Sequence, residues 1–141
     1  MKAIDGLIRL HRWKLDEKRL KLAELERLVA HLRDEMRKLE DSVVEERAFA
    51  ATSPEAGYAF GSFAAEAVER RRRLQDSLTE AEGQMQAAHD EVADAFRELK
   101  KFDVVKSRET RAAEDRERRR EQSSLDEIGL SLYRRKQEGA A

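Results

Sequence analysis

The spacing of apolar residues in the first third of the chain is the feature that most limits what it can fold into. From Ile4 to Val43 the spacing alternates between three and four residues, interrupted only by His11 and Lys18. A mean spacing of about 3.5 residues keeps one apolar seam against one partner helix, whereas the period of about 3.6 in a straight helix drifts away from it. The pattern therefore predicts a coiled-coil helix one over about residues 1–51. Its seam positions are Ile4, Ile8, His11, Leu15, Lys18, Leu22, Leu25, Val29, Leu32, Met36, Leu39 and Val43.

The single proline marks the end of this pattern. Pro54 lies in the segment from Ala51 to Gly57, the one clear break along the chain. Ser53 suits the cap of a new helix, Pro54 its first turn, where no amide donor is needed, and Glu55 its positive N-terminal end. We expect a turn over about residues 52–58, after which the chain comes back on itself.

A second seam follows the turn and differs in composition from the first. Alanine recurs where helix one has leucine, and small residues facing large ones let two helices approach closely. The two seams are therefore complementary, and a short turn makes their pairing antiparallel. We expect helix two over about residues 59–137 and a single domain over residues 1–141. The second seam consists of Ala64, Ala67, Arg71, Leu74, Leu78, Ala81, Met85, Ala88, Val92, Ala95, Leu99 and Phe102.

The expected fold is all-α: a long antiparallel two-helix coiled coil, or helical hairpin, in which helix two is longer than helix one. With a turn centred near Ala56, residue i lies opposite roughly residue 112 − i. The start of helix one therefore lies opposite about residue 110 of helix two, and helix two has no partner beyond that point. The polar stretch from Lys106 to Ser124 is typical of an unpaired overhang. Beyond it four apolar residues share one helical face, namely Leu125, Ile128, Leu132 and Tyr133. Either this face stays open, or the start of helix one shifts register to cover it.

Composition supports an elongated molecule. Charged residues make up 42% of the chain and aromatic residues only 6%, so a compact globular core is disfavoured, whereas a hairpin leaves most of its surface to water. The formal net charge of -1 gives no global attraction to nucleic acid or anionic lipid. The absence of cysteine excludes thiol chemistry, and the N-terminus lacks the apolar core of a signal peptide, so we expect a cytoplasmic protein.

Catalytic, cofactor and metal motifs are absent from the sequence. The three histidines, His11, His31 and His89, have no Glu three residues before them, as a di-iron bundle requires. The six glycines are isolated and form no phosphate-binding loop, and no serine is paired with a histidine. We therefore expect no enzyme activity, no cofactor and no metal.

Two basic runs raise the question of nucleic-acid binding. One is Arg70 to Arg73, and the other lies within the stretch from Lys106 to Gln122, which holds seven basic and five acidic residues. A surplus of two charges is too small for contact with many phosphates. We interpret both runs as solvated helix faces and expect no nucleic-acid partner. The alternative, nucleic-acid binding through the run from Arg70 to Arg73, requires an affinity that falls steeply with salt.

Apolar residues also gather at the two ends of the predicted hairpin. Tyr58, Phe60 and Phe63 crowd just after the turn, where they either pack onto Phe49 or form a docking patch. At the other end, a second apolar strip of helix one lies off the seam and needs a cover, which makes this end an interaction surface. That strip consists of Leu10, Trp13 and Leu20.

With these features the chain resembles the FliJ family of the bacterial flagellar export apparatus, to which the stalk proteins of type III secretion are related. The resemblance rests on the opening LIRLHRWKLDEKRLKLAELE, on YAFGSFAAEAVERRRRL after the turn, and on the ending REQSSLDEIGLSLYRRK. In that ending, LDEI at residues 125–128 matches a hydrophobic-Asp-Glu-hydrophobic signature of the family.

The resemblance implies a non-catalytic hairpin similar to the central stalk of rotary ATPases. Its implied partners are the ring of the export ATPase (FliI-like), the export gate protein (FlhA-like) and export chaperones, and membrane association is peripheral, only through the export apparatus at the inner membrane. The implied gate interface consists of Phe63, Ala67, Arg70 and Leu74. The ATPase-ring interface that we expect at the end holding the termini consists of Leu10, Trp13, Leu125, Asp126, Glu127 and Ile128.

The chain differs from the family at one set of positions, and two alternatives to the assignment stay open. The family has aromatic and polar residues on the facing part of helix one, where this chain has Glu35, Leu39, Ser42 and Glu46, so the expected aromatics are missing. The alternatives are a type III secretion stalk protein and a generic coiled-coil scaffold that dimerises in parallel through the seam of helix one.

Overall fold

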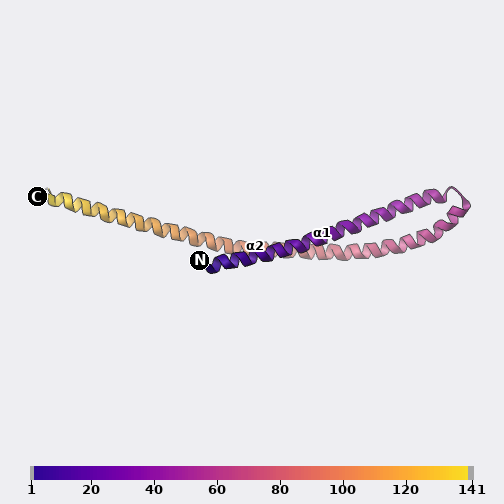
Figure 1. Ribbon diagram of the computed structural model, residues 1–141, viewed down its shortest axis with the longest axis horizontal. Helices are drawn as coiled ribbons and strands as arrows, with labels where there is room; N and C mark the ends of the chain where they lie inside the picture. Colours follow the sequence, from indigo (N-terminus) through magenta and orange to yellow (C-terminus); the bar gives the residue numbers. More distant parts are fainter. Residues whose placement is uncertain (1, 140–141) are drawn as a thin grey trace. The chain divides into compact units, whose positions relative to one another are not determined.

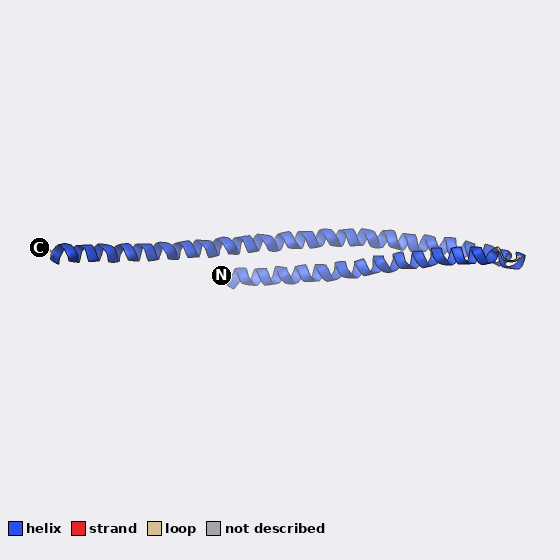
Figure 2. Ribbon diagram, turned by 90° about the horizontal axis from the view of Figure 1, so that it is seen from above, coloured by secondary structure: helices blue, strands red, loops and turns tan. Residues whose placement is uncertain are grey.

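The described residues form two α-helices. The computed structural model describes residues 2–139, of which α1 spans Lys2–Ala50 and α2 spans Pro54–Gly139 (Figure 2). No strand occurs within residues 2–139, and α2, with 86 residues, is longer than α1, with 49. The expected fold class, an all-α helical hairpin with a longer second helix, is therefore confirmed.

The chain divides into two compact units. The hairpin unit comprises residues 11–97, and the terminal unit comprises residues 1–10 together with 98–141. In the hairpin unit, α1 and the first half of α2 run in opposite directions on either side of the turn (Figure 1). Each unit is therefore built from a piece of both helices.

The turn is held by backbone and hydroxyl hydrogen bonds. The Ala56 N–H donates to Ser53 Oγ at 3.1 Å and the Gly57 N–H donates to the Ser53 carbonyl at 3.1 Å, which is the arrangement of an N-cap. The Thr52 N–H and hydroxyl both donate to the Phe49 carbonyl and close the end of α1. The predicted start of helix two near residue 59 was too late, because the Ser53 cap lets α2 begin at Pro54.

Complementary seams form the core of the hairpin unit. Val29 of α1 is only 2% exposed and packs with Leu78 and Ala81 of α2, and the partly buried Leu32, Met36 and Met85 surround them. Every predicted seam position of α1 is buried or partly buried, and so is every one of α2 except Arg71. Because α2 covers the α1 seam, that seam is not available for a parallel dimer in this conformation.

Ion pairs across the hairpin unit report its register. Their residue numbers add to between 105 and 115, around the predicted value of 112. Each pair has at least one exposed or half-exposed partner, so each contributes little to stability, on the order of 0–1 kcal/mol. The pairs are Lys18–Glu91 (3.2 Å), Arg33–Glu82 (3.2 Å), Glu35–Arg70 (3.4 Å), Glu40–Arg71 (3.6 Å) and Glu26–His89 (3.7 Å).

The terminal unit begins as a helix pair and continues as one helix. Ile8 and Leu99 are its buried residues, and Lys106 Nζ lies 2.6 Å from Asp5 Oδ1, an oxygen otherwise shielded from water. This contact lowers the pKa of the Asp5 carboxyl below 3.8. Beyond Lys106, the ion pairs and side-chain hydrogen bonds of the described residues join positions three or four apart within α2.

Candidate functional site

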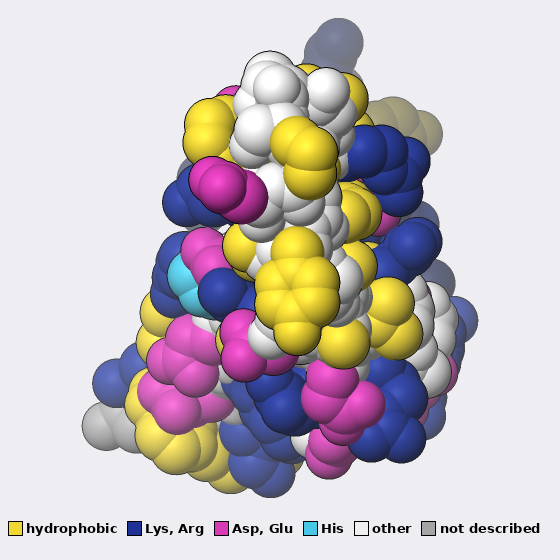
Figure 3. Space-filling view, turned by 90° about the vertical axis from the view of Figure 1, so that its right-hand side faces the viewer, with side chains coloured by type: hydrophobic (Ala, Val, Ile, Leu, Met, Phe, Trp, Pro, Cys, Tyr) yellow, Lys and Arg dark blue, Asp and Glu magenta, His cyan; other side chains and the backbone are white. Residues whose placement is uncertain are grey.

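Two rings of the aromatic cluster at the turn, those of Phe60 and Phe63, pack against each other. The rings of Phe60 and Phe63 lie 6.3 Å apart at an angle of 33°, and both side chains are partly buried. Tyr58 is 90% exposed and Phe49 is 62% exposed, so Phe49 does not hold the cluster down. Figure 3 looks onto this end of the chain and shows hydrophobic side chains over the backbone, with charged side chains around them. Of the two alternatives, packing onto Phe49 or an accessible patch, the exposure of Tyr58 and Phe49 favours the accessible patch.

The predicted gate residues occupy one line along α2 in the hairpin unit. Phe63, Ala67, Arg70 and Leu74 follow one another at helical spacing, and Arg70 Nη2 lies 3.4 Å from Glu35 Oε2 of α1. Ala67 is buried and Phe63 and Leu74 are partly buried. A partner on this line therefore meets the edge of the seam, where Arg70 is the most accessible member.

A neighbouring apolar groove was not singled out from the sequence. It has a volume of about 360 Å³ and runs between the two helices near the turn. Val44 and Val68 are both exposed, and each lies one position after a seam residue. Apolar residues directly beside the seam are the sequence feature from which the groove could have been predicted. The lining residues are Leu39, Glu40, Val43, Val44, Arg47, Phe60, Ala64, Ala67, Val68 and Arg71.

The arginine run after the turn is largely paired with carboxylates. Arg70 pairs with Glu35, Arg71 with Glu40, and Arg72 with Glu69 at 2.6 Å. The contact with Glu69 raises the pKa of the Arg72 guanidinium. This pairing favours the interpretation of the run as a solvated face, because paired arginines offer less charge to phosphates.

The C-terminal part of α2 presents an open apolar strip in the terminal unit. Leu125, Ile128 and Leu132 are 62%, 56% and 58% exposed, so the start of α1 does not cover them (Figure 1). At about 100° per residue, Asp126 and Glu127 lie on the other side of the helix from this strip. The LDEI segment therefore offers an apolar face and an acidic face at the same height.

The predicted ATPase-ring residues do not form one cluster. The register places Leu10 opposite about residue 101 of α2, so Leu125 lies about 36 Å further along the helix, at 1.5 Å per residue. Trp13 is exposed and belongs to the hairpin unit, whereas Leu10 belongs to the terminal unit. The four residues from Leu125 to Ile128 are consecutive on α2, whereas Leu10 and Trp13 lie on α1.

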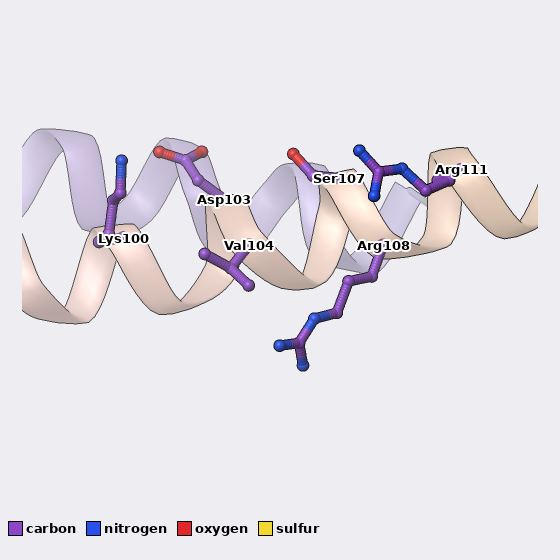
Figure 4. A pocket seen from close by; sticks show the side chains of 6 residues that line it. All are labelled: Lys100, Asp103, Val104, Ser107, Arg108 and Arg111. Carbon is purple, nitrogen blue, oxygen red and sulfur yellow. The ribbon is translucent and has the colours of Figure 1, made fainter.

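A hollow of about 220 Å³ lies on α2 in the terminal unit. Its lining residues are Lys100, Asp103, Val104, Ser107, Arg108 and Arg111. Figure 4 shows that the side chains of Arg108 and Arg111 point to opposite sides of the helix, so they do not clamp a common anion. We therefore assign no ligand to it.

Neither a metal-binding group nor a membrane-spanning helix is found within residues 2–139. That range holds no group of three His, Cys, Asp or Glu side chains arranged to bind a metal ion. No helix within it is long and apolar enough to cross a membrane. The contact with Lys38 lowers the pKa of the Asp34 carboxyl and raises that of Lys38, and this pair lies four residues apart on one helix, as on a solvated face.

The comparison with protein families decides the assignment. The sequence model described as "Flagellar FliJ protein" matches residues 1–138. The chain belongs to the FliJ family. FliJ-family proteins are non-catalytic components of flagellar protein export. No curated protein and no solved structure matches the chain at the significance required.

Proposed function

We propose that this FliJ-family chain is a stalk of the flagellar export apparatus that binds the ring of the export ATPase and stimulates its ATP hydrolysis. The observation that carries the proposal is the C-terminal part of α2, which runs on without α1 and exposes Leu125 and Ile128 on one face, with Asp126 and Glu127 on the other. Exposed apolar strips of this kind mark protein interaction sites.

A single helix with unequal faces suits the centre of a symmetric ring. A ring subunit that faces Leu125 and Ile128 meets apolar surface, whereas one on the opposite side meets Asp126 and Glu127. The stalk therefore interacts differently with each subunit, and differential interaction is what shifts a subunit between conformations. Leu10 and Trp13 lie further from the C-terminus on α1, and we assign them to the rim of the ring.

The end of the hairpin unit at the turn is assigned to the export gate. Phe63, Ala67, Arg70 and Leu74 would form the gate interface, and the exposed Tyr58 lies next to them in sequence. Aromatic and arginine side chains are enriched among residues that dominate binding energy, which supports this assignment. Export chaperones are proposed as further partners.

The location follows from these partners. We place the chain in the cytoplasm, peripheral to the inner membrane and held there only through the export apparatus. We also propose that residues 1–141 work as a single domain.

The proposal is tested with the cognate export ATPase. Purified chain is added at increasing concentration and steady-state phosphate release is measured. Stimulation is expected for the native chain. For a chain with Leu125→Asp and Ile128→Asp, the concentration that gives half-maximal stimulation is expected to rise at least about ten-fold, because charged side chains on the strip oppose its burial. The matched control is Ala112→Asp, on the same exposed helix but outside the strip. Absence of stimulation by the native chain contradicts the proposal.

A further inference from the structure

We propose that two copies of this chain pair in antiparallel orientation through residues 121–136 of α2, which form a self-complementary dimerisation segment. The inference goes beyond the proposed function, although it uses the same part of α2. It rests on an apolar strip, on the charges that flank it, and on small residues beside it.

The apolar strip has no cover from its own chain. Leu125, Ile128 and Leu132 are spaced by three and four residues and so lie on one face, and all three are more than half exposed. Among the described side chains, the ion pair between α1 and α2 that lies nearest the strip joins Asp5 to Lys106, well before the strip begins. A spacing of three and four is the pattern by which one helix packs along another.

The charges on the same face select the orientation. Glu121 precedes the strip by four residues, and Arg135 and Lys136 follow it by three and four. At about 100° per residue these three side chains share the face of the strip, whereas Asp126 and Glu127 do not. In an antiparallel pair, Glu121 of one copy lies opposite Arg135 and Lys136 of the other, and the contact occurs twice. A parallel pair places like charges side by side.

These flanking charges are also free to pair with another copy. Within residues 2–139, Glu121, Arg135 and Lys136 take part in no ion pair, whereas their neighbours Arg118 and Arg120 pair with Asp115 and Glu117. The residues three and four positions from Glu121 on its C-terminal side are Ser124 and Leu125, which offer no cation. Arg118 lies three residues before Glu121 and Glu138 three residues after Arg135, but neither forms an ion pair with these charges, which leaves them open to a second copy.

The centre of the segment allows two helices to come close. Gly129 lies beside the strip near its middle, and a Cβ placed there meets nothing within 4 Å. An antiparallel pair in which residue i faces about 257 − i brings Gly129 next to Ile128 of the other copy, and Leu125 next to Leu132. Small residues facing large ones allow the same close approach that Ala81 and Val29 make within the hairpin unit. The contact is isologous, as in most homodimers.

The length of the segment limits the strength of the dimer. Sixteen residues span about 24 Å, so the contact area is at the low end of specific interfaces and the dimer is weak and reversible. Pairing covers Leu125, Ile128 and Leu132 and leaves Asp126 and Glu127 in solvent. An ATPase ring that takes the strip therefore competes with the second copy.

Sedimentation equilibrium without any partner is the first test. The mass is expected to rise from 16.3 kDa toward twice that value over about 1–500 µM chain. Glu121→Lys is expected to raise the dimer dissociation constant about ten-fold, and so is Arg135→Glu combined with Lys136→Glu, while an equal mixture of the two variants restores association. Helicity is checked by circular dichroism. A chain that remains monomeric, or variants that associate as the native chain does, overturn the proposal.

Orientation is tested by single cysteines, because the native chain has none. Gly129→Cys is expected to form a disulfide-linked dimer quickly, since the two copies of residue 129 lie near the two-fold axis. Gln122→Cys, on the same side of the helix, is separated from its copy by about 20 Å and is expected to stay monomeric. Equal cross-linking at both positions indicates a parallel pair and contradicts the proposal.

A charge variant separates this proposal from the proposed function. Asp126→Ala with Glu127→Ala changes the acidic face only, so dimerisation is expected to remain unchanged. Glu121→Lys is expected to weaken the dimer without abolishing stimulation of the ATPase. If association of the chain is observed only when the export ATPase is present, the strip is a site for the ATPase and the dimer is excluded.

Discussion

Among the described side chains, Lys106 of α2 and Asp5 of α1 form the ion pair between the two helices that lies nearest the C-terminus of α2, with Nζ 2.6 Å from Oδ1. On one side of this pair the helices bury Ile8 and Leu99, and on the other side α2 continues alone to Gly139. The pair therefore marks the boundary between a part of the chain that is stabilised by packing and a part that depends on its own helical hydrogen bonds.

This boundary predicts a step in hydrogen exchange along α2. Amides of residues 107–139 open without breaking contacts to α1, whereas amides around Leu78 and Ala81 open only when the core separates. We expect exchange from residues 107–139 to be faster by at least about ten-fold, measured by mass spectrometry of peptides. Equal protection along α2 contradicts the prediction for the isolated monomer.

The ion pair itself predicts an acid-sensitive contact. Lys106 lowers the pKa of the Asp5 carboxyl below 3.8, so its contribution to stability is fully present above pH 3.8 and is lost as the pH falls through the lower, folded-state pKa. Asp5→Asn is expected to speed exchange in the first turns of α1 at about pH 6 and to make no difference at an acid pH below the lowered, folded-state pKa, where the carboxyl is protonated. An effect that persists at the lower pH would rule out the charge as its cause.

The buried seam predicts that its small residues are as important as its large ones. Ala81 is buried against Val29, so Ala81→Leu is expected to cost about 1–3 kcal/mol in the free energy of unfolding. Val29→Ala in the same chain should recover part of that loss, because it removes volume at the contact. Ala112→Leu, on an exposed position, is the control and should change stability by less than about 0.5 kcal/mol. Urea denaturation measures all four chains.

The cap at the turn predicts a position-specific effect on stability. Ser53 Oγ accepts the Ala56 N–H, so Ser53→Ala is expected to cost about 1 kcal/mol, and Ser53→Asp should be tolerated because its carboxylate also caps a helix. Thermal unfolding followed by circular dichroism compares the two. Equal loss in both chains would show that the hydroxyl group acts in another way.

The exposed strip is expected to contribute to partner binding and not to the stability of the fold. Leu125→Asp combined with Ile128→Asp is expected to leave the free energy of unfolding within about 0.5 kcal/mol of the native value, because neither side chain packs against α1. Val29→Asp, by contrast, buries an unpaired charge and should unfold the hairpin unit. A large loss of stability in the first variant would mean that the strip has a cover within the chain.

Most of the hairpin was predictable because its information is local and periodic. Leu15, Val29 and Leu78 were recognised as core residues from spacing alone, and all three are buried. Arg71 was wrongly predicted to lie in the buried seam, because spacing alone places every side chain at that period in the seam. Its long cationic side chain instead reaches Glu40 at the surface. The early start of α2 was implied by Ser53 and Pro54 but missed in the predicted range.

The surfaces were less predictable because they depend on which neighbours are missing. The groove containing Val44 and Val68 requires the register of both helices, and the packing of Phe60 against Phe63 requires the geometry of the turn. From the sequence, Leu125 and Ile128 could be either exposed or covered by the start of α1. The outcome depends on the register in which α1 packs against α2.

Site-specific photocross-linking tests the central claim most directly. A photoreactive amino acid is placed at Ile128, at Tyr58 or, as a control, at Ala112, and each chain is mixed with the cognate export ATPase and gate protein. The account predicts adducts with the ATPase from position 128, adducts with the gate from position 58, and neither from position 112. Adducts with the gate from position 128, or no ATPase adduct from any position, would contradict it.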